Sequence, residues 1–160
     1  MPLARYLCPT RYEDFEVGAV VLHEQRRVVT ETDNLLFSRL SGHEHPSLFV
    51  YAQQQQGAVP VLPFLVLAIC GGVAVRATSQ QAIANLGWEY IRFPNPAYVG
   101  DSLRAISHVA AKRLSRRDPN RGIVTIVTYG VRQDDAIVLE ARRSFLMPAG
   151  SDAIQPRVKT

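Results

Sequence analysis

The longest stretch without a charged or polar side chain runs from Ala58 to Val75 and limits the possible folds more than any other feature. Its 18 residues are interrupted by two prolines and two glycines, whereas a membrane-spanning helix needs about 20 consecutive apolar residues. The part from Val61 to Ala77 therefore predicts a helix that is apolar on every side and wrapped by other structure. Pro63 can occupy its first turn, and Gly71-Gly72 indicates the close approach of another backbone or a kink. We expect no association with a membrane.

Most of the chain after Ser79 has the residue pattern of strands. Strands are predicted over Val20–Val29, Ala82–Phe93, Ser102–Leu114, Gly122–Arg132 and Ala136–Met147. The order strand, short helix, long helix, antiparallel meander predicts an α+β fold, in which a sheet of about five strands wraps one long apolar helix. Because such a sheet has open edges, we expect a dimer.

The short helix is predicted from its start and stop signals. Thr30 is a good N-cap, and Asp33 follows at the spacing of a capping box. Gly42 is a plausible C-terminal stop. The helix should cover about Glu31 to Leu40.

The length of 160 residues suits one domain. We expect an N-terminal arm over residues 1–10, the domain over 11–148 and a flexible polar tail over 149–160. Cys8 and Cys70 have no CxxC neighbour, and the first residues do not form a secretory signal. A reduced, cytoplasmic setting is the expectation.

The net charge is +4, and several basic residues lie in one run from Lys112 to Arg117. A solvated hairpin is the plainer interpretation of this run, and a contact with an anion such as a nucleotide phosphate is the alternative. No aromatic platform or recognition helix accompanies the charge, so we do not expect nucleic acid as a partner.

Three segments resemble the MaoC-like dehydratase and hydratase family, which has the hot-dog fold. They are "YEDFEVGAV" (12–20), "VTETDNLLFSRLSG" (29–42) and "AIANLGWEYIRFPNPAYVGDSL" (82–103). The "ANLG" at the start of the third is most similar to the mesaconyl-CoA and itaconyl-CoA hydratase branch. The resemblance implies reversible addition of water to an enoyl thioester of CoA or acyl carrier protein, without a cofactor. It also implies a homodimer or a pair with another hot-dog chain.

The loop "SGHEHPSLF" departs from the family's catalytic pattern, "GDxNPxH". With Gly42 aligned to the motif glycine, His43 stands where the family has its aspartate, and Leu48 stands where it has its histidine. Leucine cannot transfer a proton, so the usual Asp/His pair is missing. Leu62-Pro63 also replaces a more polar pair at the helix N-terminus, where backbone N–H groups would hold the thioester oxygen.

Three interpretations of the loop remain open. His43, Glu44 and His45 could form a relocated acid–base set. The chain could instead bind an acyl thioester without turnover, as the inactive subunit of a heterodimer. A repurposed biosynthetic enzyme, such as a thioesterase, isomerase or cyclase, is the third. The two histidines and the glutamate could ligate zinc, but no further motif supports a metal, and we predict none.

Candidate substrate-binding residues lie on three segments: Tyr51, Leu62, Phe64, Asn85, Gly87 and Arg92. Three of them have a structural alternative. Tyr51 could serve in packing, Asn85 could satisfy a strand edge, and Arg92 could be ion-paired or solvated. The apolar residues around the loop predict an apolar acyl chain as ligand. His23 and His108 are expected to be surface or satisfied core residues.

Overall fold

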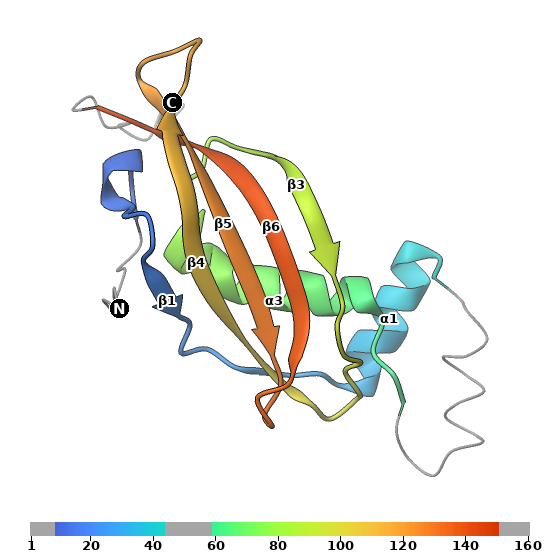
Figure 1. Cartoon of the computed structure of the whole chain (residues 1–160). Helices are drawn as coiled ribbons and strands as arrows, with labels where there is room; N and C mark the ends of the chain where they lie inside the picture. The colour runs from blue at the N-terminus through green and yellow to red at the C-terminus, as the bar shows by residue number, and fades with distance from the viewer. Residues whose placement is uncertain (1–8, 44–58, 151–160) are drawn as a thin grey trace, which may run out of the picture.

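A computed structural model describes residues 9–43 and 59–150 of the chain. Its helices are η1 (Tyr12–Asp14), α1 (Glu31–Ser41) and α3 (Pro63–Thr78), and its strands are β1 (Val20–Leu22), β2 (Arg27–Val28), β3 (Ala84–Arg92), β4 (Ser102–Leu114), β5 (Arg121–Val131) and β6 (Ile137–Pro148). The strands form one antiparallel sheet in the order β1-β4-β5-β6-β3, with β2 also paired to β4. α3 lies across one face of this sheet (Figure 1), so the expected α+β arrangement is confirmed.

The prediction of a four-strand meander was wrong for its first strand. β3 pairs with β6 at the far edge of the sheet and not with β4, its successor in the chain. Tight turns link β4 to β5 and β5 to β6, whereas the connection from Phe93 to Asp101 is longer and contains Pro94 and Pro96. A connection of this length can pass the end of the sheet and reach a non-neighbouring strand.

The strand predicted over residues 20–29 is divided into β1 and β2. Leu22 faces Ile106 and Arg27 faces Leu103, so five steps along this segment oppose three along β4. The two surplus residues cannot stay in register, and the segment between β1 and β2 bulges away from β4.

The predicted signals at the helix ends are confirmed. Thr30 and Asp33 form a capping box at the start of α1, and Gly42 ends it with a left-handed φ of 70°. Pro63 is the first residue of α3, where its missing N–H costs no hydrogen bond.

The core lies between α3 and the sheet. α3 contributes Leu65, Val66, Cys70 and Ala74, all buried. A second apolar cluster around Phe145 fills the opposite end of the sheet. The sheet wraps one side of α3, and within the described residues the outer face of the helix is exposed, including Phe64 at 48% and Val75 at 39%.

The C-terminal tail begins later than predicted. Ala149 is buried and its N–H donates to the carbonyl of Asn120. The N–H of Gly150 donates to the Glu13 carboxylate. Residues 149 and 150 are therefore part of the domain.

His23 lies just after β1. Of the two predicted alternatives, a surface residue or a satisfied core residue, the structure shows the second. Its Nε2 is 2.9 Å from the hydroxyl of Ser107, which in turn is 3.2 Å from the hydroxyl of Thr128. All three are buried on the face that carries the core. Burial lowers the pKa of His23 from 6.5 to about 4, because a charged imidazole would lose its hydration there.

This pKa predicts how folding stability depends on pH. Below pH 6.5 the unfolded chain binds a proton at His23, and the folded chain does not until about pH 4. The free energy of unfolding should therefore fall as the pH drops through this window, by about 3 kcal/mol in total. Urea unfolding at several pH values checks this. His23→Gln should reduce the dependence of the free energy of unfolding on pH, whereas His108→Gln should leave it unchanged. The same pH dependence in the wild type and both variants would contradict a role for His23.

Candidate functional site

The N-terminus of α3 has one backbone donor without a partner in the described residues. Pro63 has no N–H, and the N–H groups of Leu65 and Val66 both donate to the carbonyl of Leu62. The N–H of Leu62 itself donates to the side-chain oxygen of Asn34. The N–H of Phe64 is thus the free donor, and the positive end of the helix dipole adds to its attraction for an oxyanion.

The ring of His43 packs beside the side chain of Phe64. Its ring centroid is 5.8 Å from that of Phe64, and the Phe64 ring meets Phe93 edge to face at 6.0 Å. The main chain of His43 is held by α1, since its carbonyl accepts from the Ser38 hydroxyl at 2.7 Å. The side chain of His43 is exposed.

A donor at a helix N-terminus and an imidazole packed on the side chain of the same residue are suited to the chemistry of a carbonyl compound. The N–H can stabilise the charge that develops on a carbonyl oxygen. An imidazole can take a proton from a neighbouring carbon or activate a water molecule. The rings of Phe64 and Phe93 form an apolar wall of the site.

The structure brings together only part of the predicted site. Glu44, His45 and Tyr51 lie outside the described residues. Leu62 is buried in the core beneath the site, whereas Phe64 is half-exposed at the site itself.

The three predicted residues on β3 are spread along the strand. Asn85 and Gly87 pair with Phe145 and Ser144, at the end away from the α3 N-terminus. Arg92 is at the near end, next to Phe93, but its guanidinium stacks 4.5 Å from the centroid of the Tyr90 ring. Within this chain, Asn85 and Gly87 are therefore remote from His43.

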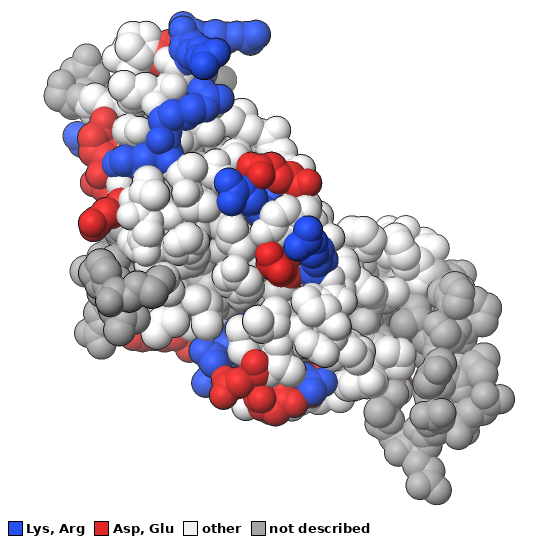
Figure 2. Space-filling model, in the orientation of Figure 1, with Lys and Arg blue, Asp and Glu red and all other residues white. Residues whose placement is uncertain are grey.

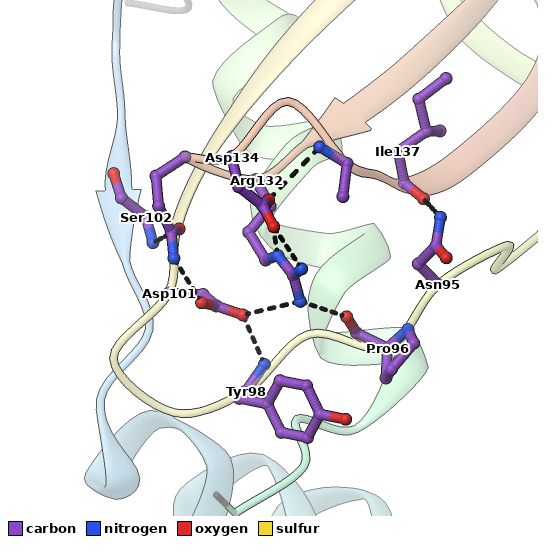
Figure 3. Close-up of polar contacts among 10 residues, drawn as sticks. Asn95, Pro96, Tyr98, Asp101, Ser102, Arg132, Asp134 and Ile137 are labelled. Atoms are coloured by element: carbon purple, nitrogen blue, oxygen red, sulfur yellow. Dashed lines mark hydrogen bonds and ion pairs between the residues drawn. The ribbon is translucent and has the colours of Figure 1, made fainter.

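A polar network beneath the site was not predicted (Figure 3). Asp101 is buried, and its carboxylate accepts from the Tyr98 N–H and the Gln133 side-chain amide, each at 2.7 Å. The Arg132 guanidinium donates to the Pro96 carbonyl and forms a bidentate pair with Asp134. The hairpin between β5 and β6 is in this way fastened to the connection that follows β3.

This connection also fixes the entry to α3. The Val61 N–H donates to the Ala97 carbonyl at 2.8 Å, and the Val99 N–H donates to the Val59 carbonyl at 2.9 Å. Val61 immediately precedes Leu62, the N-cap of α3. The network therefore determines where the Phe64 N–H lies.

The basic run of residues 112–117 lies elsewhere, at the end of the sheet where β4 and β5 meet. Figure 2 shows Lys and Arg gathered there, while the middle of the same face carries side chains of both signs next to one another. Lys112 stacks on the Tyr12 ring and its ammonium donates to the Phe15 carbonyl, so part of the run supports the N-terminal segment. The run is at the opposite end of β4 from the α3 N-terminus.

Residues 9–43 and 59–150 contain neither a metal-ligand cluster nor a membrane-spanning helix. No group of three His, Cys, Asp or Glu side chains there could hold a metal ion. None of the helices in these ranges is long and apolar enough to cross a membrane.

The chain is similar to proteins of one known family. The family model of mesaconyl-CoA hydratase matches residues 8–154. A β-methylmalyl-CoA dehydratase of Chloroflexus aurantiacus is 36% identical over 152 residues, which are 93% of this chain and 43% of that protein. A solved structure from the same organism, described as a MaoC domain protein dehydratase, is 31% identical with a TM-score of 0.82, over 98% of this chain and 46% of that one.

A Mycobacterium tuberculosis protein with a double hot-dog fold is 22% identical, with a TM-score of 0.80, over 97% of this chain and 48% of that one. The chain therefore belongs to the mesaconyl-CoA hydratase family of MaoC-like proteins and has the hot-dog fold. It spans less than half the length of the curated relatives that it matches.

The network under the site predicts a large effect for Asp101→Asn. An asparagine can offer its oxygen to one donor but turns its own N–H₂ group toward the other, so we expect a loss of about 1–3 kcal/mol in the free energy of unfolding. Asp135→Asn is the matched control, because Asp135 is 81% exposed in its pair with Arg104 and should cost less than about 1 kcal/mol. Urea unfolding compares the two, and equal effects would contradict the role of Asp101.

Proposed function

We propose that the chain is one hot-dog half of a hydratase or dehydratase for acyl-CoA thioesters. The observation that carries the proposal is the N–H of Phe64 at the α3 N-terminus, which has no partner within the described residues, with the His43 ring packed on the Phe64 ring. Family membership supports it, since the relatives are named as a β-methylmalyl-CoA dehydratase and a mesaconyl-CoA hydratase. Acyl carrier protein is the other possible carrier of the acyl group.

In the dehydration direction, the thioester oxygen accepts the Phe64 N–H. A base removes a proton from the α-carbon, and the electron pair of that C–H bond moves onto the carbonyl oxygen as an enolate. The enolate then forms the carbon–carbon double bond while the β-hydroxyl, protonated by an acid, leaves as water. Hydration is the reverse of these steps.

His43 supplies one of the two proton transfers in this scheme. It is next to the carbonyl site, and its main chain is fixed at the end of α1. Glu44 and His45, which lie outside the described residues, are the candidates of this chain for the second transfer.

The acyl group in this proposal is apolar. The rings of Phe64 and Phe93 form a cluster with the His43 ring at the α3 N-terminus. The relatives' names contain acyl groups with a second carboxylate, so the substrate of this chain would differ from theirs.

The partner in the assembly is a second hot-dog domain, either another copy or a homologous chain. The edge strand β3 exposes Leu86 and Trp88, and Ile83 just before it is also exposed. On the open face of α3, a Cβ added at Gly71 or Gly72 would meet nothing within 4 Å. A second domain on this surface would cover an apolar edge that otherwise invites aggregation.

A second candidate function is an acyl-binding subunit without turnover. It is favoured by the sequence of the loop, in which His43 and Leu48 stand in place of the family's aspartate and histidine. The partner domain would then contribute the acid and the base.

Turnover measurements separate these two functions. The purified chain is incubated with enoyl- and 3-hydroxyacyl-CoA substrates of different chain length and acidity, and the gain or loss of water is followed by mass spectrometry. We expect hydration of apolar acyl groups, with a loss of at least ~100-fold in kcat for His43→Gln. Glu44→Gln run alongside tests the second transfer. A folded protein with binding and no turnover would favour the acyl-binding subunit, and preference for short dicarboxylic substrates would overturn the apolar assignment.

Charge placed on the β3 edge should prevent assembly. Leu86→Asp should convert the dimer, or the complex with a co-expressed homologue, into single chains, because a carboxylate would be buried without a partner. Leu114→Asp is the matched control, since Leu114 is 52% exposed and Leu86 is 49% exposed. Analytical ultracentrifugation measures the association state. Dissociation by both substitutions, or by neither, would contradict an interface at β3.

A further inference from the structure

The fully buried residues of α1 are both polar. They are Asn34, 6% exposed, and Ser38, 3% exposed, one turn apart on the same side of the helix. Leu35, Leu36 and Leu40 of the same helix are 49%, 56% and 79% exposed. A surface helix usually turns its apolar side inward, so this reversed arrangement needs a reason other than core packing.

Asn34 binds the backbone at the start of α3 with both ends of its amide. Its Nδ2 donates to the Pro60 carbonyl and its Oδ1 accepts from the Leu62 N–H, each at 3.0 Å. Aspartate could accept but not donate, and serine is too short to reach both groups. The carboxamide therefore fixes α1 against the turn that leads into α3, and it occupies the Leu62 N–H so that the Phe64 N–H is the donor that remains.

Ser38 fixes the other member of the site. Its hydroxyl donates to the His43 carbonyl at 2.7 Å. His43 follows the left-handed Gly42 at the end of α1, and this hydrogen bond draws its main chain back along the helix. The Ser41 hydroxyl donates to the Phe37 carbonyl at 2.6 Å and accepts a longer hydrogen bond, 3.4 Å, from the His43 N–H, so it holds His43 less firmly than Ser38 does.

We infer that Asn34 and Ser38 are positioning residues which set the His43 ring at its distance from the Phe64 ring at the start of α3. α1 acts as a spacer of fixed length, joined to α3 through Asn34 and to His43 through Ser38. The consequence for catalysis rests on the proposed function, whereas the geometry of His43 can be tested without it. Because proton transfer needs the imidazole within hydrogen-bond reach, a loss of position should lower kcat and leave KM nearly unchanged.

Nuclear magnetic resonance of the His43 ring provides a test that does not require activity. The Phe64 ring lies close enough to shift the resonance of the proton on Cε1 of His43 by its ring current. In protein labelled with ¹³C-histidine, His43→Gln identifies this signal, and Phe64→Leu gives its position without the ring. Ser38→Ala and Asn34→Ser should each move the signal at least halfway toward the Phe64→Leu position. Ser41→Ala, the serine control, should move it clearly less than Ser38→Ala does, because Ser41 contributes only the longer of the two hydrogen bonds to His43.

Kinetics with the best substrate complete the experiment. Ser38→Ala should lower kcat by about 10- to 100-fold with KM changed less than about twofold. An unmoved His43 signal in both Ser38→Ala and Asn34→Ser would overturn the inference. If Asn34→Ser does not fold, Ser38→Ala decides alone. If the wild-type chain turns over no thioester, the proposed function fails, and the resonance shifts still decide whether α1 positions His43.

Discussion

The architecture depends on the packing of one face of α3 against the antiparallel sheet. Leu65, Val66, Cys70 and Ala74 give the sheet a continuous apolar ridge to close around. The contact is tight at its centre, where a Cβ on Gly130 of β5 would come within 2.6 Å of the Cys70 sulfur. Because the helix is held along its length, its N-terminus can serve as a fixed point, and both the candidate site and the network around Asp101 are built on that point.

Much of the fold could be predicted because its signals are local. The capping box at Thr30, the proline at the start of α3 and the strand β4 all depend on residues that are close in sequence. The position of β3 beside β6 could not be derived in this way, since the pairing joins residues about 50 positions apart, such as Tyr90 and Glu140. The division of the first strand was missed for a related reason, because it arises from a mismatch of register with β4.

In the candidate site too, residues marked by a local sequence motif could be predicted, and residues whose role depends on distant partners could not. His43 and Phe64 could be selected from the sequence because they belong to a recognisable loop and a helix start. Asn34 and Ser38 stood in the segment that carries the family resemblance, yet a polar residue in a helix gives no sign that it faces inward. Asp101 was also part of a quoted motif, but its partner Gln133 is 32 residues away, in a hairpin that reads as an ordinary turn.

The pairing of β3 with β6 has a consequence for the order in which the chain can fold during synthesis. β3 leaves the ribosome long before its neighbour, because the whole of β4 and β5 must be made before β6. Until β6 arrives, neither edge of β3 has a strand to pair with, and Leu86 and Trp88 are exposed on a strand that could join another chain. Non-local pairing of this kind is slow to form. The chain is therefore most prone to aggregation until β6, the last strand to be synthesised, has paired with β3.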